Sequence, residues 1–563
     1  MPGATTGDRP TTRIEVPFLV VGAGPVGLVA ARLLADAGHD CLVVERRDGP
    51  QRHPAAHVVN ARTLEILRQA GFDMDAVHAV AKDPGESGHV NFVTRLDGEL
   101  IGRLPFERQG DECLRYTPTP LRNISQHRLE PLLADAVAQM AGVDLRYGVE
   151  WRSAEQDAEG VTSVLVDLDG GEPIEVRSRY VLAADGAGSR VRTWLGIGMV
   201  GPARLQSFVA IHVAADLRAV VADRPGVLHF VMDPAAGGVF VAHDPGSEWV
   251  FMVDFDPDGE CVEEYDDARC AAIVRRALGG VDVPFQVLGA GSWHMTAQVA
   301  ERMRSDRVFL VGDAAHRFPP TGGLGLNTGV ADAHDLAWKL DAVERGWGGS
   351  ALLDTYDAER RPVACVNCEQ STSNAMRILE LVDALGLVEE PTTERLHASL
   401  DDPGAAERIA AAVDAQATHF DMLGLQLGHV YADGALVREG EPPPTMLDPR
   451  SFEPDAAVGA RLPHAWTADG RSTLDLVDPR VLTLLSAGEH DRWREAVRLV
   501  DAPVAHVRIG RDVLVDEGWA AVCRLGPGGA LLVRPDHHVA WRTDEATAER
   551  FAALPDAVAR VLA

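Results

Sequence analysis

The sequence predicts an α/β protein of several domains. Its 563 residues fit three or four domains at roughly 150 residues each. Segments typical of strands and of helices alternate over the first ~200 residues, which favours an open sheet with helices on both faces. Between residues 205 and 300, short runs rich in β-branched and aromatic residues are separated by Asp, Pro and Gly. These runs favour a second, antiparallel sheet.

Composition and charge exclude several classes of function. The chain has 53 Lys and Arg residues against 84 Asp and Glu residues, a formal net charge of −31, and no basic block, so nucleic acid is not an expected partner. The uncharged stretch at residues 16–31 is shorter than the ~20 residues of a membrane span and is interrupted by glycines, so neither a membrane anchor nor a signal peptide is expected. The seven cysteines include one close pair, Cys365 and Cys368, without a second pair to complete a metal site. We therefore expect no metal and a reducing, cytoplasmic location.

The first functional motif is a glycine-rich turn between a strand and a helix. The apolar strand Phe18–Val21 enters the segment Gly22-Ala-Gly24-Pro-Val-Gly27, and a helix rich in Ala and Leu follows. Gly22 allows the tight turn, Gly24 lets the backbone approach a pyrophosphate at the helix N-terminus, and Gly27 lets the helix pack closely on the strand. Glu45 ends the next strand, 18 residues after Gly27, where a carboxylate binds an adenosine ribose. An acidic residue there repels a 2′-phosphate, so the turn favours FAD or NAD over NADP.

Two later segments repeat the geometry of a strand that ends in glycine and aspartate. One strand runs into Asp185-Gly186, and residues 308–311 run into Gly312-Asp313. Both aspartates follow the carboxyl end of a strand, which is the edge where open α/β sheets bind ligands. The loop 319–328 then opens a helix, whose N-terminus suits the negative charge of a reduced flavin. A plain dehydrogenase needs only the first turn, so these segments favour FAD.

With these three motifs in order, the chain resembles the single-component FAD-dependent aromatic hydroxylases, the class A flavoprotein monooxygenases, over nearly its whole length. The first turn with Glu45 looks like the family's ADP-binding fingerprint, Asp185-Gly186 like its segment that touches FAD and the nicotinamide cofactor, and Gly312-Asp313 like its ribityl contact. Residues 61–65 and 126–130 match further family stretches. The cofactor-binding residues that the resemblance implies are Gly22, Gly24, Pro25, Val26, Gly27, Glu45, Arg46, Gln126, Arg128, Asp185, Gly186, Gly312, Asp313, Gly325, Leu326 and Asn327.

The resemblance also implies the activity and the cosubstrates. NADPH or NADH reduces the FAD, which takes up O2 and, as a C4a-hydroperoxyflavin, delivers an oxygen atom to an electron-rich ring. The expected substrate is a small aromatic compound, a phenol or a hydroxypyridine-like ring, including one from secondary metabolism. No second Gly-x-Gly-x-x-Gly follows a strand, in agreement with a family in which the nicotinamide cofactor binds without a Rossmann domain of its own. A homodimer is compatible with this assignment.

The motifs and the resemblance divide the chain into five parts. We expect a discontinuous Rossmann-type FAD-binding domain at 14–200 and 301–375, a substrate-binding β-sheet domain at 201–300, a helical segment at 376–440, a linker at 441–458 and a thioredoxin-like domain at 459–563. The last resembles the C-terminal domain of the phenol hydroxylase and dichlorophenol hydroxylase branch through residues 459–463 and 532–535. It contains Cys523 but no Cys-x-x-Cys, so redox chemistry is not expected there.

The substrate site needs a base, because a phenol attacks an electrophilic oxygen better once its hydroxyl is deprotonated. His57 is the catalytic candidate. It precedes Arg62 at the spacing where the phenol hydroxylase branch carries its acid/base residue, and imidazole titrates in the useful range. His212, His229 and His243, on the expected substrate sheet, are weaker candidates for the base. The substrate-binding candidates are His57, His212, His229, Trp293 and Pro320.

Two alternatives stay open. The same fold supports Baeyer–Villiger oxygen insertion or epoxidation, in which no base is needed. From a different class, a protein that sequesters an aromatic ligand would use FAD as structural filler. Halogenases are discarded, because they carry Trp-x-Trp-x-Ile-Pro and no two of the ten tryptophans stand two apart. Relatives commonly carry Pro-Arg-Ala where this chain has Pro54-Ala55-Ala56, so no detail of flavin movement or nicotinamide docking is carried over at Ala55.

Overall fold

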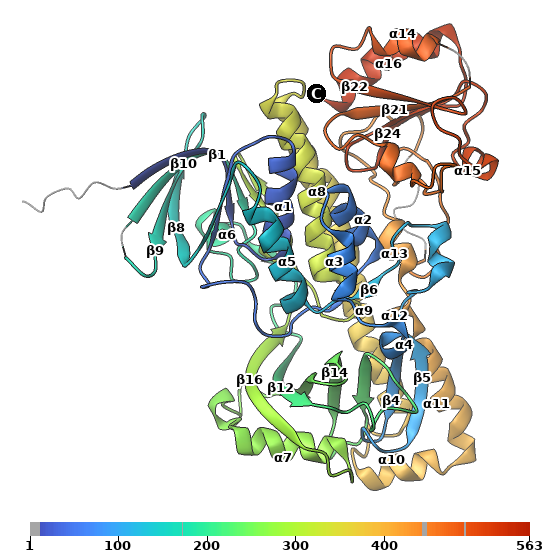
Figure 1. Ribbon diagram of the computed structural model, residues 1–563. Coiled ribbons are helices and arrows are strands. Elements are labelled where there is room, and N and C mark those ends of the chain that lie inside the picture. Colours follow the sequence, from blue (N-terminus) through green and yellow to red (C-terminus); the bar gives the residue numbers. More distant parts are fainter. Residues whose placement is uncertain (1–11, 172, 442–447, 489–490) are drawn as a thin grey trace, which may run out of the picture.

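The computed structural model describes residues 12–171, 173–441, 448–488 and 491–563. In Figure 1 a mixed sheet with long helices lies in the middle of the molecule, a second sheet lies below it, and a C-terminal α/β unit lies at the upper right. Part of the expected linker 441–458, residues 442–447, falls outside the described residues; residues 448–458 contain no helix or strand.

The mixed sheet carries the glycine-rich turn. In spatial order its main path runs through β18 (Arg304–Ser305), β19 (Val308–Leu310), β10 (Pro173–Ala183), β1 (Thr12–Val21), β2 (Cys41–Glu45) and β7 (Val143–Tyr147); β9 (Val161–Asp167) pairs with β10, and β8 (Val149–Gln156) pairs with β9. From β19 to β7 the neighbours on this path are parallel. Parallel neighbours need crossover connections, and the helices α1 (Pro25–Asp36), α5 (Gln126–Ala138) and α8 (Leu324–Glu344) pack together beside the sheet. The expected alternation of strands and helices is therefore confirmed, but α1, α5 and α8 pack on one another and cover one face of the sheet instead of the two faces expected. The carboxyl ends of β1, β2, β10 and β19 meet at one edge.

The second sheet is antiparallel except at one pair. Its order is β16 (Phe285–Met295), β12 (Gln206–Ala215), β15 (Glu248–Asp254), β14 (Gly238–Asp244), β13 (Leu228–Val231), β4 (His89–Val93) and β5 (Leu100–Pro105). The pair β13–β4 is parallel. We expected residues 14–200 to belong to the FAD-binding domain, yet β4 and β5 extend this sheet. The reason is burial: Val90, Phe92 and Leu104 share an apolar core with the helices that follow.

Those helices fill the segment expected to be helical. After α9 (Thr355–Ala384) come α10 (Thr393–Leu400), α11 (Pro403–Ala415), α12 (Ala417–Phe420) and α13 (Leu423–Leu427). On the opposite face of the second sheet, α7 (Asp267–Leu278) covers a core that includes Ile211, Phe240, Trp249 and Phe251. The sheet is thus covered by α7 on one side, while α9 to α12 cover only the β4–β5 end of the other side and leave the rest of it to face the mixed sheet.

The segment between the two sheets is made of short elements. A two-stranded pairing joins β3 (Val58–Val59) to β6 (Arg122–Asn123), and the helices α2 (Ala61–Gln69), α3 (Met74–Ala79) and α4 (Pro84–Ser87) lie in between along the chain. Asn60 caps α2 by accepting a hydrogen bond from the N–H of Thr63. This layer carries His57 and therefore positions the predicted base.

The C-terminal unit has a four-stranded sheet of its own. Its order is β22 (Val504–Ile509), β21 (Leu482–Ala487), β23 (Ala530–Val533) and β24 (Val539–Thr543), with β21 and β22 parallel and the other pairs antiparallel. The helices are α14 (Arg492–Val497), α15 (Glu517–Val522) and α16 (Ala548–Val561). Trp338 and Ala342 of α8 share a core with Trp493 and Trp541, so the unit packs on the same helix that opens at the predicted flavin site.

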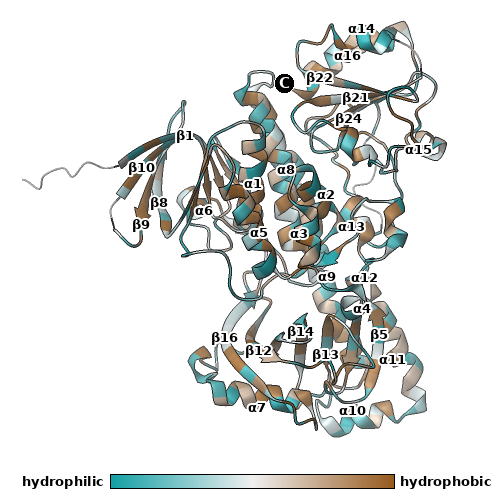
Figure 2. Ribbon diagram, in the orientation of Figure 1, coloured by the Kyte–Doolittle hydropathy of each residue, from teal (hydrophilic) through white to brown (hydrophobic). Residues whose placement is uncertain are grey.

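The distribution of hydropathy follows this architecture. Figure 2 shows hydrophobic residues concentrated on the strands, whereas α7, α10 and α16 mix hydrophobic with hydrophilic positions, as expected for helices that cover a sheet on one side only. Among the helices of the described residues, none has both the length and the apolar character that crossing a bilayer would require.

Candidate active site

The glycine-rich turn has the close contacts that only glycine permits. Gly22 has φ +105°, and a Cβ there would lie 2.2 Å from the carbonyl oxygen of Ala184, the residue that follows β10. A Cβ on Gly27 would lie 2.0 Å from the carbonyl oxygen of Gly22. Around Gly24, by contrast, no atom lies within 4 Å of a Cβ position, and no side chain caps α1 at this residue. The start of α1 is therefore open and presents free N–H groups, as a pyrophosphate site requires.

Glu45 lies at the end of β2, where the sequence placed it. Its carboxylate is buried and accepts hydrogen bonds from the N–H of Ala23 at 3.0 Å and from Arg47 Nε at 3.1 Å. Burial raises the pKa of Glu45, but the hydrogen bonds and the charge of Arg47, with the Ala23 N–H, outweigh it and hold the pKa below its usual value. A negative charge thus stands beside the glycine-rich turn. Arg46, the neighbouring predicted residue, is exposed.

Asp185 and Gly186 follow β10 directly. Asp185 Oδ2 accepts the N–H groups of Arg190 and Val191 at 2.8 and 3.2 Å, while its Oδ1 is buried without a hydrogen-bond partner among the described residues. Burial raises the pKa of Asp185. Arg192, the cation that could have paired with Asp185, instead donates to the carbonyl oxygen of Ala314 at 2.9 Å. Asp185 and Arg192 therefore form no ion pair, and Oδ1 of Asp185 remains unpaired at the edge of the sheet where ligands bind.

Asp313 lies at the head of α8. Its side chain is exposed, and it forms no hydrogen bond or ion pair with the rest of the described chain. Its Oδ1 lies 3.8 Å from a Cβ position on Gly325, the second residue of α8. The helix begins after Gly323, which has φ +62°, and no side chain caps it. A carboxylate and a set of free helix N–H groups therefore face the same space, together with Gly312 and Leu326.

Asn327 has a structural task beside this space. Its Oδ1 accepts the N–H of Asn60 at 2.9 Å, and its Nδ2 donates to the carbonyl oxygen of Val58 at 3.0 Å. The side chain thereby joins α8 to the layer that carries His57. Only the backbone N–H of Asn327 is left for a cofactor.

These groups fit FAD. A pyrophosphate suits the open turn at Gly24, a ribose suits the Glu45 carboxylate, and the ribityl chain and the flavin edge suit Asp313 and the uncapped start of α8. Pro25 and Val26 form the first turn of α1 in this arrangement. The buried, unpartnered Oδ1 of Asp185 is a further group that a ligand would satisfy.

Gln126 and Arg128 begin α5, and they point in different directions. Gln126 Nε2 donates to Glu130 at 3.0 Å. Arg128 pairs with Asp244 at 3.2 Å and lies 3.7 Å from Glu248, both on the second sheet. The guanidinium of Arg128 thus lies beside the substrate sheet, and its expected contact with FAD stays a prediction.

The substrate side of the second sheet is apolar and only partly covered. Phe208 and Trp293 stack at 4.9 Å between ring centroids on neighbouring strands. Met252 and Val239 are paired neighbours further along the sheet, and all four side chains are partly buried. The sequence singled out Trp293, and the structure places it on this side.

His57 lies between the two sheets. Its Nδ1 is 3.0 Å from Asn123 Oδ1, and Asn123 Nδ2 donates to Gln109 Oε1 at 3.2 Å. The amide orientation makes Asn123 Oδ1 an acceptor, so Nδ1 of His57 carries the proton and Nε2 keeps its lone pair. Burial, reinforced by the charge of Lys82, lowers the pKa of His57 to about 3. The imidazole is therefore neutral, with Nε2 as an acceptor.

Other histidines gather beside His57. Its ring centroid is 5.7 Å from that of His243, whose Nδ1 is 2.8 Å from the hydroxyl of Ser125. His127 and His212 lie 3.0 and 3.1 Å from the two carboxylate oxygens of Glu248. The sequence named His212, and His243 as a weaker candidate for the base, but missed His127, Lys82 and Glu248. The one sequence signal for this cluster is the strand alternation, which puts His243 on the same side of the second sheet as His212.

Two other candidates lie elsewhere. His229 is on the side of the sheet that α7 covers, buried with its ring 5.9 Å from Trp249. Strand alternation places it there, and burial lowers its pKa to about 4. Pro320 is exposed, and its carbonyl oxygen accepts the N–H of Gly323 at 3.0 Å within the loop.

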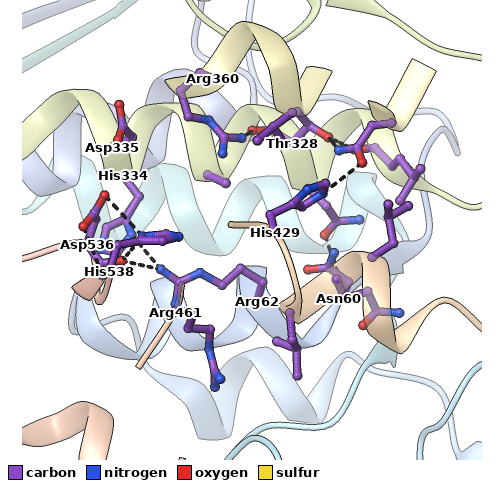
Figure 3. Close-up of a pocket in the computed structure, with 18 of the residues that line it drawn as sticks. Asn60, Arg62, Thr328, His334, Asp335, Arg360, His429, Arg461, Asp536 and His538 are labelled. Carbon is purple, nitrogen blue, oxygen red and sulfur yellow. Dashed lines mark hydrogen bonds and ion pairs between the residues drawn. The ribbon is translucent and has the colours of Figure 1, made fainter. Parts of the chain in front are cut away.

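A second polar cavity, of about 50 Å³, lies behind the first turn of α8, between α2, α9 and the C-terminal unit (Figure 3). Thr328, His429, Arg461 and His538 are among the residues that line it. Such a volume holds a few water molecules. The buried Nδ1 of His429 and Nη1 of Arg461, which have no partner among the described residues, are groups that water would satisfy.

Next to this cavity, three carboxylates come within metal-binding distance of one another: Asp335, Glu359 and Asp536. Lys339 pairs with Asp335 at 2.8 Å and with Glu359 at 2.7 Å, and Arg534 pairs with all three. Two cationic side chains thus already pair with the three carboxylates, and burial raises the pKa of Asp335 well above its usual value, which favours its neutral form.

The comparisons with known proteins give the class. The FAD binding domain family matches residues 15–371, and the aromatic-ring hydroxylase C-terminal family matches residues 455–563. The chain belongs to the class A FAD-dependent aromatic hydroxylases, and the expected family, cofactor and enzyme class are confirmed. It is an FAD-dependent monooxygenase that uses NAD(P)H and O2.

Individual relatives cover almost the whole chain. A putative polyketide hydroxylase of Streptomyces halstedii is 37% identical over 548 residues, 94% of each chain. The 2,4-dichlorophenol 6-monooxygenase of Delftia acidovorans is 32% identical over 562 residues, 94% of this chain and 95% of that protein. Among solved structures, the flavin-dependent monooxygenase PieE, in complex with FAD and substrate, is similar with a TM-score of 0.91 and 36% identity, covering 98% of this chain and 99% of that one.

Proposed function

We propose that this hydroxylase acts on a phenolic ring of a polycyclic aromatic secondary metabolite of the polyketide type. The observation that carries the proposal is the apolar side of the second sheet, where Phe208, Trp293, Met252 and Val239 adjoin the histidine cluster. An apolar wall with a few polar groups at one end suits a flat ring system that carries a hydroxyl. The names of the relatives support this choice, since one is a putative polyketide hydroxylase and another a dichlorophenol monooxygenase.

In this proposal His57 faces the substrate hydroxyl. Its neutral Nε2 accepts a hydrogen bond from the hydroxyl, and Asn123 fixes the ring through Nδ1. Orientation by a fixed acceptor brings the ring carbon that will be oxidised into a defined position. His212 and Trp293 would line the same site, whereas the burial of His229 beneath α7 argues against substrate contact.

The cofactor supplies the oxidising chemistry. When bound, FAD reduced by NADPH or NADH provides an activated oxygen atom from O2. Gly24, Glu45, Asp185 and Asp313 are the residues that we propose to hold it. The chain itself contributes binding, orientation of the phenol and exclusion of water.

We also propose finer assignments for the rest of the chain. The order strand, helix, strand, helix, strand, strand, helix from β21 to α16, with one parallel and two antiparallel pairs, supports a thioredoxin-like topology for residues 459–563. Seven cysteines without disulfide bonds support a reducing, cytoplasmic location. A homodimer stays a proposal.

The test uses the FAD-loaded full chain with NADPH and NADH and a panel of tricyclic and tetracyclic phenols. We expect substrate-stimulated NAD(P)H oxidation and a product that carries one ¹⁸O atom from ¹⁸O2 on an intact ring, as determined by mass spectrometry and NMR. The matched control is the methyl ether of each phenol, which should not be hydroxylated because it has no hydroxyl proton. Equal turnover of the ethers, or a ring-expanded product, would overturn the proposal.

A further inference from the structure

Lysine is almost absent from this protein. Of the 53 Lys and Arg residues, only Lys82 and Lys339 are lysine. Lys339 is fully buried and pairs with Asp335 and Glu359. Lys82 has its Nζ buried but without a hydrogen-bond partner among the described residues. A buried amine without a partner is costly, because the charged form loses its hydration and gains no ion pair. The burial of Lys82 therefore needs a physical explanation, whereas Lys339 is stabilised by its two ion pairs.

Lys82 is anchored to the same layer as His57. Its backbone N–H donates to the carbonyl oxygen of Asn123 at 2.9 Å. The side chain of Asn123 holds His57, and β6, which contains Asn123, pairs with β3 immediately after His57. One residue thus fixes the backbone of the lysine and the imidazole of the histidine.

The side chain of Lys82 extends into the polar cluster between the sheets. Its charge acts on His57 and on His243, lowering the pKa of both. The charged and titratable groups around it are Arg128 and His127 on α5, His243 and Asp244 on β14, Glu248 on β15, His212 on β12, Glu86 on α4, and His57. Arg128 already pairs with Asp244 and lies 3.7 Å from Glu248, so both carboxylates already have a cationic partner other than Lys82.

The two basic groups of the site differ in how well they hold a proton. Burial lowers the pKa of Lys82 to about 7, with Arg128 adding to the effect and Asp244, Glu248 and Glu86 opposing it. Near neutral pH a large fraction of this amine is uncharged and can accept a proton. The pKa of His57, at about 3, leaves its imidazolium a poor store for a proton at the same pH. A group whose pKa lies near the working pH is the more effective acceptor.

We propose that Lys82 is the proton acceptor of the substrate site: the single hydrogen of the phenolic hydroxyl, which His57 Nε2 first orients, turns to the uncharged amine and is transferred to it, and the resulting ammonium remains beside the phenolate oxygen. The substrate O–H bond breaks, an N–H bond forms at Nζ, and no electron changes hands. After product release the ammonium returns the proton to solvent. The inference rests on the proposed phenol substrate, and it adds a catalytic residue that the sequence did not indicate.

The first experiment measures the titration of Lys82 without any substrate. Protein labelled with ¹³C at lysine Cε and loaded with FAD has only two lysine side-chain signals, and Lys82→Met assigns them. We expect the Lys82 signal to titrate near pH 7. A Lys82 signal that titrates at the ordinary value of ~10.4 would overturn the proposal. This result stands even if no phenol in the panel is hydroxylated.

The second experiment separates acceptance of a proton from mere positive charge. Lys82→Arg keeps a cation that cannot lose its proton, and Lys82→Met removes it. Reduced, FAD-loaded enzyme is mixed with O2 and a phenol that the wild-type enzyme hydroxylates, from pH 5.5 to 9.5. We expect both variants to bind FAD and to be reduced normally, to hydroxylate ~10²–10⁴-fold more slowly at pH 7 with release of H2O2, and to lose the inflection near pH 7 of the wild-type profile.

The outcomes distinguish this inference from the proposed function. If the wild-type enzyme hydroxylates no phenol, the proposed function is refuted. The inference about Lys82 is then tested by its titration alone. Wild-type activity in Lys82→Arg shows that only a positive charge is needed and overturns the role as acceptor. Glu159→Gln is the matched control, because it removes an exposed charge from the turn between β8 and β9, which is not among the groups that act on Lys82, and should leave the profile within about twofold of wild type.

Discussion

Gly24 and Gly27 lie in one turn but have different surroundings, so alanine should affect them differently. At Gly24 the space around a Cβ is empty and the backbone has φ −73°, which any residue adopts. At Gly27 a Cβ would lie 2.0 Å from a backbone oxygen of Gly22. Gly24→Ala should therefore disturb only a bound pyrophosphate, whereas Gly27→Ala should disturb the protein itself.

The magnitudes follow from these contacts. Real Cβ atoms stay at least 3.0 Å from such an oxygen, so Gly27→Ala must open the turn by about 1 Å, and overpacking of this kind costs about 1–3 kcal/mol of folding stability. For Gly24→Ala the free energy of unfolding of the apoprotein should change by less than about 1 kcal/mol, the range of a helix N-cap substitution. In the FAD complex the new methyl meets the pyrophosphate, and the same overpacking cost then weakens binding roughly 5- to 140-fold.

The assay compares two quantities for each variant. Urea unfolding of the apoprotein gives stability, and quenching of flavin fluorescence on titration with FAD gives the Kd. We expect Gly24→Ala to lose affinity with stability unchanged, and Gly27→Ala to lose both. If Gly24→Ala binds FAD as tightly as the wild type, the pyrophosphate does not lie at the start of α1, and the assignment of this turn is refuted.

Four other residues test separate parts of the structure. Asp313→Asn should release FAD on gel filtration, because its unpaired carboxylate is proposed to hold the ribityl chain; full occupancy would contradict this. His57→Ala should bind and reduce FAD but hydroxylate roughly 10²-fold less, with H2O2 as the measured product, because the substrate hydroxyl loses the acceptor that orients it; wild-type coupling would make His57 structural. Arg534→Met leaves buried carboxylates unpaired and should cost about 3–5 kcal/mol in urea unfolding; a loss under about 1 kcal/mol would show that the cluster is not charged. Burial raises the pKa of Glu107 from 4.5 to about 8. Between pH 4.5 and pH 8 the folded state therefore keeps a proton that the unfolded chain has released. The free energy of unfolding should fall as pH rises through this range, by up to about 1.4 kcal/mol per pH unit. Glu107→Gln should flatten this slope in urea unfolding, and an unchanged slope would assign it to other groups.

The cofactor edge could be predicted because its parts are local in the sequence. A strand, a glycine-rich turn and a helix N-terminus are consecutive, and the turn acts through its backbone. The strands β10 and β19, which precede Asp185 and Asp313, and β2, which ends at Glu45, run parallel, so these three carboxylates lie at the same edge of the sheet. Secondary-structure propensity and the spacing of the glycines are sufficient to predict such an arrangement, because it does not depend on side chains from distant parts of the chain.

The substrate site could be predicted only in part, because its side chains come from distant segments. His57, Lys82, His127, His243 and Glu248 lie on five segments that meet only when the two sheets pack together. Strand alternation puts His229 and His212 on opposite sides of the sheet, but the sequence does not tell which side α7 covers. The same limit explains β4 and β5: a parallel pairing between β4 and β13 joins distant parts of the chain, and no local pattern signals it.

The C-terminal unit has no redox cysteines, so its contribution must come from contacts. Arg534 supplies the cation for carboxylates on α8 and α9, and Arg461 Nε donates to Glu65 of α2 at 2.8 Å. Both α2 and α8 also meet at the layer that carries His57. Without this unit, buried carboxylates on three helices would lose their partners, and protonation or exposure would follow because an isolated buried charge is too costly. The unit thereby holds in place the helix whose first turn is proposed to face the flavin, and it does so by electrostatics and packing rather than by chemistry of its own.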